Sequence, residues 1–278
     1  MSPCPHKNVA TRTMKYSRSF VIIMVTFIFS FSAIPLYAQI SGASSAKNIM
    51  VKSSRASKAK LTARITLDGY YQTGNTERAN ISGGLFAAAI DSIKEFSVNG
   101  KYLYGESNKT ANLKEYIAGI QYDYHPFSVL SPFVRVEFYK NEFRKINGRY
   151  SGLLGAKYRF FVKPEILDYS VSTALLYDME RYVTEVDLPD KERLRMSVRP
   201  KFKHNLTDNM YLIAEVYYKP NLLDFDDYIL FGNLNFNVLV FKRGLLRLSY
   251  EHEYNSKPAT DKVRKTDALL LAGLGIEF

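Results

Sequence analysis

The sequence has little of what stabilises or equips many secreted proteins. Its single cysteine, Cys4, precedes an apolar run that we expect to be removed, so the mature chain has no disulfide, no thiol nucleophile and no lipid-attachment cysteine. None of the four histidines has a partner at metal-ligand spacing, so no metal or other cofactor is expected. From residue 61 onward no helical period of useful length occurs. Stability must therefore come from burial and hydrogen bonding in a chain built mainly of strands.

The first 38 residues have the pattern of a secretory signal peptide. Four basic residues and no acid precede an apolar run at 20–34, and the small residue Ala38 lies at the expected cleavage point. The alternative is a membrane anchor, but the run is shorter than the ~20 apolar residues that an anchor needs. We predict export with cleavage after Ala38. The start is either Met1 or Met14, since the shorter chain still holds a complete signal.

The next segment, 39–60, is rich in Ser, Ala and Lys, and its composition predicts a flexible basic periplasmic leader. The net charge of +11 is concentrated in these two segments. Removing the four charges of the signal and the five of the leader leaves only +2 for residues 61–278. Nucleic-acid binding requires a basic patch on a folded face, so no nucleic-acid partner is expected. The leader could contact anionic lipid, although a solvated tail is the simpler expectation.

Residues 61–278 form about twelve alternating segments separated by turn signals. Apolar and polar side chains fall on opposite faces of each, because successive residues of a strand point to opposite sides. The predicted strands are 61–72, 79–90, 95–105, 114–124, 133–141, 150–160, 169–180, 193–203, 211–218, 228–238, 245–254 and 266–278. Pro200 interrupts the eighth, and because proline donates no ladder hydrogen bond we expect a bulge or a strand end there.

The last segment shows the alternation most clearly. One of its faces is entirely apolar and consists of Ala268, Leu270, Ala272, Leu274, Ile276 and Phe278. The other face is mostly small or charged, with Leu269 and Leu271 as exceptions. Transmembrane barrels use strands of ~9–11 residues with this alternation, whereas a soluble edge strand is the alternative. We predict that Phe278 is the assembly signal that the barrel-assembly machinery recognises, and that this segment closes the barrel against the first strand.

These features predict an all-β fold, an antiparallel transmembrane β-barrel of the bacterial outer membrane with about 12 strands, embedded in outer-membrane lipid. Odd-to-even connections should be the longer, extracellular ones. Tyrosines and phenylalanines, 39 in total, gather at predicted strand ends and would form two aromatic bands. A soluble secreted β-protein is the alternative. The oligomeric state is left open.

The polar face must point inward, because a charge on the lipid face costs ~2–4 kcal/mol at the bilayer midplane. The candidate lumen-lining residues are Arg135, Glu137, Lys157, Arg159, Arg195, Arg199, Glu215, Arg247 and Glu251. We expect Arg195 and Arg199 to meet opposite charges across the lumen. Their candidate partners are Glu137, Glu215 and Glu251. Twelve strands lie between filled and open barrels, so a plugged lumen and a narrow aqueous path both stay open.

The pattern supports a non-enzymatic role, either structural or as a narrow passage for small solutes. The alternative is an outer-membrane hydrolase with a site in the extracellular loops, for which Asp226, Asp227 and His252 are the candidates. A nucleophilic serine would need a base beside it, and Ser249 has the opposite parity to His252. Asp224 adds to the same acidic loop, which we expect to be solvated rather than to bind calcium.

Four stretches resemble a known family in their order and spacing. They are LDGYYQTGNT at 67–76, YLYGE at 102–106, GAKYRF at 155–160, and YEHEYNSKP from residue 250 followed by TD before the last strand. Together they resemble domain-of-unknown-function family 481, the salt-induced outer-membrane protein family, over residues 64–278. The resemblance implies an outer-membrane barrel of undetermined biochemical role and brings no catalytic residues. The basic leader and the long start before the signal depart from the family's usual pattern.

Overall fold

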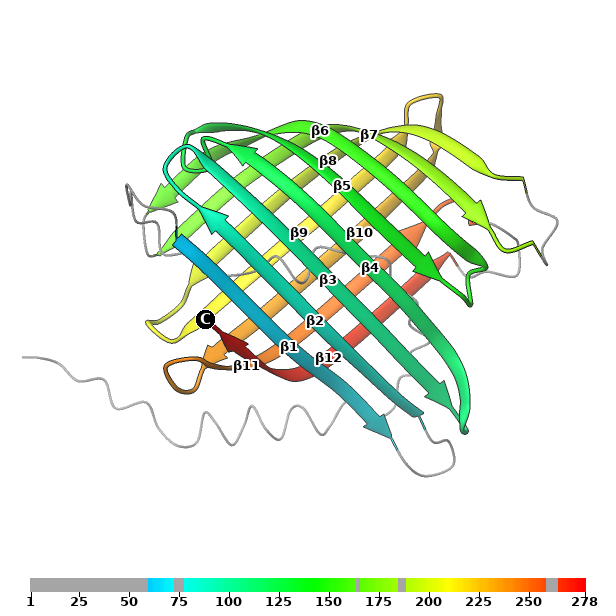
Figure 1. Cartoon of the computed structure of the whole chain (residues 1–278), viewed down its shortest axis with the longest axis horizontal. Helices are drawn as coiled ribbons and strands as arrows, with labels where there is room; N and C mark the ends of the chain where they lie inside the picture. Colours follow the sequence, from blue (N-terminus) through cyan, green and yellow to red (C-terminus); the bar gives the residue numbers. More distant parts are fainter. Residues whose placement is uncertain (1–59, 73–77, 164–165, 185–188, 259–264) are drawn as a thin grey trace, which may run out of the picture. The chain divides into compact units, whose positions relative to one another are not determined.

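The computed structural model describes residues 60–72, 78–163, 166–184, 189–258 and 265–278. The predicted signal peptide, most of the predicted leader and the true start of the chain lie outside the described residues. Within the described part, twelve strands follow one another along the chain (Figure 1). They are β1 (Lys60–Gln72), β2 (Arg78–Ile90), β3 (Lys94–Ser107), β4 (Thr110–Tyr124), β5 (Leu130–Asn141), β6 (Ile146–Lys163), β7 (Leu167–Tyr182), β8 (Lys191–Asn205), β9 (Met210–Asn221), β10 (Asp224–Leu239), β11 (Gly244–Asn255) and β12 (Thr266–Glu277).

The strands form one closed barrel in which each pairs with its neighbours in sequence and β12 pairs with β1. All the ladders are antiparallel, and each of the predicted segments overlaps one observed strand. The predicted fold class and strand number are therefore confirmed. Among the described residues, no helix is long and apolar enough to cross a membrane.

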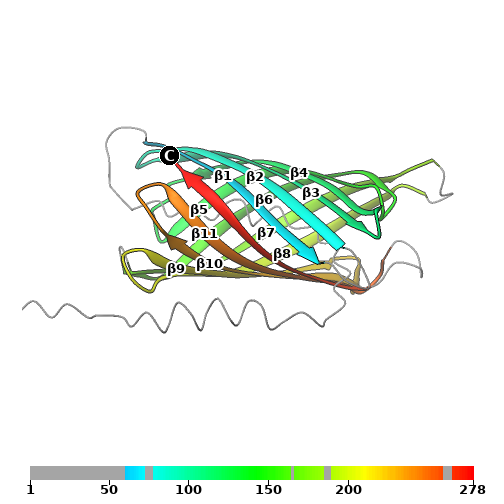
Figure 2. The same cartoon turned by 90° about the horizontal axis from the view of Figure 1, so that it is seen from below.

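Barrel closure is made where β12 lies beside β1 (Figure 2). The register runs from Arg64↔Glu277 to Gly69↔Ala272. Beyond the last strand residue, the Phe278 N–H donates to the Ala63 carbonyl at 2.8 Å, and the Ala63 N–H donates back to the Phe278 carbonyl at 3.1 Å. The predicted pairing of the last strand with the first is confirmed. The end of the barrel that holds this contact is called the Phe278 end below, and the opposite end is called the far end.

The prediction of a bulge or strand end at Pro200 is wrong. Strand β8 continues to Asn205, and Pro200 pairs with Val171 of β7 in an unshifted register. On the other side, the ladder to β9 has pairs at Val198 and at Lys201 and none at Pro200. The same ladder also has no pairs at Met196, Ser197 and Arg199, so Pro200 lies in a stretch of β8 that is only loosely paired with β9, and no extra residue is inserted.

The odd-to-even connections were predicted to be the longer ones, but only some of them are long in the structure. At the far end, β3 and β4 are joined by residues 108–109, and β9 and β10 by residues 222–223. Asn108 and Lys109 have φ angles of 49° and 63°, as the central pair of a tight hairpin turn requires. Strands extend into what the sequence pattern assigned to loops, so only the connections at 183–190 and 256–265 are long.

The turns at the Phe278 end are short and held by local hydrogen bonds. In the β2–β3 turn, the Asp91 carboxylate accepts the backbone N–H groups of Lys94 and Ile93, each at 2.8 Å. These two bonds, that from Lys94 first, lower the pKa of the Asp91 carboxyl. The turn is thereby fixed by a side chain that stays ionised at neutral pH.

Outward aromatic side chains gather near both ends of the barrel. Near the far end, Tyr218, Tyr228 and Tyr254 form a row across three strands, with ring centroids 5.8 and 5.7 Å apart. Near the Phe278 end, Tyr169 packs edge-on against Phe202 at 5.1 Å. Two such bands are typical of the interfaces of membrane barrels, where amphipathic rings meet the head groups.

Candidate functional site in the lumen

The structure places all nine candidate lumen-lining residues on the inward side of their strands. Along each strand, inward residues are more buried than their outward neighbours, which include exposed Leu154, Leu175 and Val136. Arg195, Glu215 and Glu251 are at most 2% exposed. Charges of both signs therefore fill the interior of the barrel, and their contacts join strands that lie far apart in the wall.

At the Phe278 end, side chains of three strands meet inside the lumen. Arg64 on β1 forms an ion pair with Glu277 on β12. A guanidinium nitrogen of Arg64 also donates to the Tyr211 hydroxyl on β9 at 2.6 Å, and that hydroxyl donates to Glu277 at 3.1 Å. Tyr211 packs with Ile213 and Leu245, so this end is closed by a polar triad beside an apolar cluster.

At mid-height, opposite walls are joined by both polar and apolar contacts. Lys101 on β3 donates to both carboxylate oxygens of Glu251 on β11, at 2.8 and 2.9 Å. Neither side chain is more than 2% exposed. Beside this pair lies an apolar cluster from β3, β4, β10 and β12, which consists of Leu103, Leu113, Phe231, Leu269 and Leu271. A solute passing along the axis would have to displace these contacts.

Two inward glycines make room for ion pairs and hydrogen bonds that cross an intervening strand. Gly273 on β12 lies level with Asp68 on β1 and with Arg247 on β11. The Arg247 guanidinium reaches over it to Asp68, with Nε donating at 3.0 Å. A side chain at position 273 would meet the Asp68 carboxylate and the β1 backbone. The same arrangement recurs at Gly119 on β4, over which Arg135 extends.

The far end is closed by an arginine from a turn. Arg144 lies between β5 and β6 and folds back into the lumen, where its side chain is 7% exposed. It donates to Glu253 on β11 at 2.7 Å and forms a second ion pair with Asp267 on β12. These strands lie on the opposite side of the barrel from β5 and β6. The turn therefore spans the lumen.

Arg195 on β8 is the centre of a buried ion-pair group. One of its guanidinium nitrogens donates to both carboxylate oxygens of Asp227 at 2.9 and 3.0 Å, and Nε lies 3.5 Å from Asp178. Arg193 also contacts Asp227, at 3.0 Å. The partners proposed for Arg195 from the sequence are therefore wrong, because the barrel's stagger places other acids beside it. Those acids pair elsewhere, namely Glu137 with Arg135, Glu215 with Lys201 and Glu251 with Lys101.

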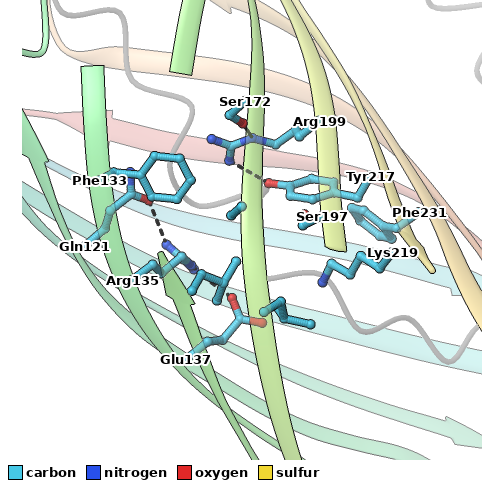
Figure 3. A pocket seen from close by; sticks show the side chains of 13 residues that line it. Gln121, Phe133, Arg135, Glu137, Ser172, Ser197, Arg199, Tyr217, Lys219 and Phe231 are labelled. Atoms are coloured by element: carbon cyan, nitrogen blue, oxygen red, sulfur yellow. Dashed lines mark hydrogen bonds and ion pairs between the residues drawn. The ribbon is translucent and has the colours of Figure 1, made fainter. Parts of the chain in front are cut away.

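Arg199, on the same face of β8, has different surroundings (Figure 3). Its Nε donates to the Ser172 hydroxyl at 3.0 Å, and a terminal nitrogen donates to the Tyr217 hydroxyl at 2.9 Å. The guanidinium carbon also lies 5.2 Å from the centre of the Tyr217 ring. The direct acidic partner predicted for Arg199 is therefore wrong, and Glu215, one of the predicted acids, is linked to Arg199 only through the Tyr217 hydroxyl, which donates to its carboxylate at 3.4 Å. Arg199 and its two hydroxyl partners line a cavity of about 40 Å³ that Arg135, Glu137 and Lys219 also border.

The remaining two candidates lie on β6, nearer the Phe278 end. Lys157 pairs with Asp123 on β4 at 3.4 Å. Arg159 lies 3.7 Å from Asp168 on β7. Both pairs are local, between strands that are next to each other or one apart, and they add to the charged lining without crossing the lumen.

A family model described as a protein of unknown function, DUF481, matches residues 65–278. The chain belongs to the DUF481 family. The resemblance found in the sequence motifs is thereby confirmed. No curated protein matches the sequence of this DUF481 chain.

Solved structures similar to the DUF481 barrel are outer-membrane barrels of low sequence identity. The KdgM porin is 12% identical, with a TM-score of 0.44 over 78% of this chain and 99% of the porin. The translocator domain of the autotransporter NalP from Neisseria meningitidis is 15% identical, with a TM-score of 0.42 over 82% of this chain and 90% of that domain. The NanC porin is 10% identical, with a TM-score of 0.43 over 78% of this chain and 98% of the porin.

The hydrolase candidates of this DUF481 chain do not share one face. Asp227 points into the lumen, where Arg193 and Arg195 hold its carboxylate. His252 stacks on outward Tyr250, with ring centroids 6.5 Å apart. Asp226 is exposed. In the described part of the chain, no group of three or more His, Cys, Asp or Glu side chains is arranged to hold a metal ion.

Several inward residues of the DUF481 barrel went unrecognised in the sequence. Leu269 and Leu271 broke the alternation of the last strand, and the structure places both in the luminal apolar cluster. Lys101 lies on the polar face of the predicted strand 95–105, but nothing in the sequence pattern indicates that it reaches Glu251. Arg144 lay in a predicted loop. Parity alone identifies the inward leucines, whereas no local signal marks a turn residue that folds back.

Proposed function

We propose that this protein is a non-enzymatic barrel of the bacterial outer membrane whose lumen is filled by its own side chains. It reaches that membrane as a precursor with a cleavable signal, through the barrel-assembly machinery, and its far end faces the outside. Its role is structural, or it passes only solutes small enough to move between rearranging side chains.

One observation carries the proposal, namely that side chains bridge the lumen at three levels. Arg64 and Tyr211 bridge it at the Phe278 end, and Arg144 does so at the far end. Lys101 and Glu251, beside the apolar cluster, bridge it in the middle. Each bridge joins strands that are at least four positions apart in the barrel order. Twelve strands lie between filled and open barrels, so the observed bridges and not the strand number support a filled lumen.

The test is the conductance of the refolded full-length mature protein in a planar lipid bilayer. We expect the unmodified protein to give little or no current. A variant with Lys101→Ala, Glu251→Ala and Phe231→Ala removes the middle bridge and should give discrete openings. The matched control removes three outward side chains, Leu154→Ala, Leu175→Ala and Leu246→Ala, which do not touch the lumen. A large, stable conductance in the unmodified protein would contradict a filled lumen.

The hydrolase alternative has no observation of geometry in its favour, because Asp227 and His252 lie on opposite faces of the wall. Activity of the purified barrel on lipid or peptide substrates that disappears in a His252→Ala variant would support an enzyme over the proposal made here.

A further inference from the structure

Arg199 is an exception among the inward arginines. Every other arginine side chain that the structure describes inside the barrel has a carboxylate oxygen within 4.0 Å. Arg199 has none within that distance and donates instead to the hydroxyl groups of Ser172 and Tyr217. Its guanidinium is therefore held by two hydroxyl groups and has no direct salt bridge, and the nearest linked acid is Glu215, which accepts from the Tyr217 hydroxyl at 3.4 Å.

A second cation faces the same cavity. Lys219 on β9 lines it, and its ammonium nitrogen lies 5.4 Å from the centre of the Tyr217 ring. Within the described residues, this ammonium has no ion pair. Tyr217 thus has a cation near its ring on two sides, Arg199 and Lys219. Aromatic faces attract cations but do not remove their charge.

The acids around the cavity leave an excess of positive charge. Arg135, Arg199 and Lys219 line it with one carboxylate, Glu137, which Arg135 already holds at 2.9 Å. Two further acids lie nearby on the adjoining strands. Glu215 is 4.0 Å from Lys201, and Asp123 is 3.4 Å from Lys157, so each has its own cation. The local balance is cationic.

The space and its chemistry suit a small anion. The cavity measures about 40 Å³, which exceeds the roughly 10–15 Å³ that one water needs by the same measure. Figure 3 shows the Arg199, Tyr217 and Lys219 side chains around this space with the Gln121 and Arg135 side chains facing them. Phe133 and Phe231 form apolar walls, so a charge inside is partly desolvated and is expensive to leave unpaired.

We propose that the mid-lumen cavity is an anion-binding site, in which Arg199 donates to a small monovalent anion such as a halide or a short carboxylate and Lys219 adds positive potential from the other side of the Tyr217 ring. The guanidinium presents N–H donors in a fixed plane, and the ammonium adds a point charge. Arg135 supplies further positive potential from the opposite wall. The site is independent of the function proposed above, because an anion can occupy it whether or not the lumen conducts.

Bromide is the probe, since it replaces halides and gives an anomalous X-ray signal. The refolded full-length mature protein is crystallised with sodium bromide, and its thermal unfolding is followed in bromide or gluconate at constant ionic strength. Gluconate is too large for the cavity. We expect an anomalous peak in the cavity within hydrogen-bonding distance of the Arg199 guanidinium, and a melting temperature that rises with bromide and then saturates.

Variants separate this site from general salt effects. Arg199→Gln should weaken bromide binding by at least about tenfold, because it removes a charge-assisted contact. Lys219→Gln should weaken bromide binding by less, because it removes only a nearby charge. The matched control is Lys203→Gln, which removes another inward lysine away from the cavity. It should leave the bromide dependence unchanged. The proposal fails if the unmodified protein shows no mid-lumen peak, or if its response to bromide equals that of Arg199→Gln. The anomalous peak needs no variant, so a variant that does not fold leaves the test intact.

Discussion

Arg195 and Arg199 are on one strand and one face, four residues apart, yet they sit in different environments. Arg195 is 2% exposed and pairs with two acids, Asp178 and Asp227, the second of which Arg193 also contacts. Arg199 has only hydroxyl partners and borders a cavity. The residue type and the face are the same, so the difference comes from what the adjoining strands present.

The pairing of β7 with β8 shows how this arises. In that register Arg199 lies level with Ser172, whereas Asp178 lies level with Arg193, next to Arg195. The acid that completes the Arg195 group, Asp227, comes from the start of β10 and reaches over β9. The far half of the barrel is therefore closed by salt bridges, while the middle keeps an arginine without an acid.

The largest expected effect comes from Arg195→Leu. The substitution leaves Asp227 and Asp178 in a buried site with one cation fewer, and breaking such a group costs about 3–5 kcal/mol. Thermal unfolding in detergent, followed by circular dichroism, should shift to lower temperature, and less protein should reach the outer membrane. Arg181→Leu is the control, because the Arg181–Asp190 pair is 58% and 60% exposed. Equal shifts in the two variants would show that the Arg195 group is not structural.

A smaller net effect is expected when both partners of the middle bridge are replaced. Lys101→Met alone strands the Glu251 carboxylate and should cost about 3–5 kcal/mol. The double variant Lys101→Met with Glu251→Leu replaces the pair by apolar groups and should recover most of that loss, since buried pairs are often no better than well-packed hydrophobic residues. A double variant as unstable as the single one would mean that the bridge has additional partners. The measurement is again the unfolding midpoint.

The smallest effect is expected for Arg199→Gln measured in gluconate. Glutamine keeps a donor for Ser172 or Tyr217, and removing an arginine that has no acid leaves no carboxylate stranded. The loss should stay within about 1 kcal/mol, the range of an ordinary hydrogen bond. Unfolding of this variant beside Arg195→Leu tests the comparison directly. A loss as large as that of Arg195→Leu would show that Arg199 is part of the same structural network.

The sequence was enough for the fold, the strand number, the closing pair and the inward parity, because all of these follow from alternation and from the cost of charge in lipid. The sequence did not predict which inward side chains contact one another. Glu251 meets Lys101, 150 residues earlier in the chain, and only the stagger of the closed barrel brings them together. Leu269 and Leu271 looked like breaks in a pattern defined by polarity. They are inward residues that fill a narrow lumen, and volume is not visible in an alternation of polar and apolar residues.

The contacts of Arg144 also bear on the order in which parts of the barrel assemble. Its two carboxylates are on β11 and β12, 109 and 123 residues later in the chain. Neither ion pair of Arg144 can form until the closing strands are in place, so we expect the β5–β6 turn to complete its inward folding as assembly finishes. A probe at that turn would report completion of the barrel, and a chain arrested before its last strand would show the turn still facing out.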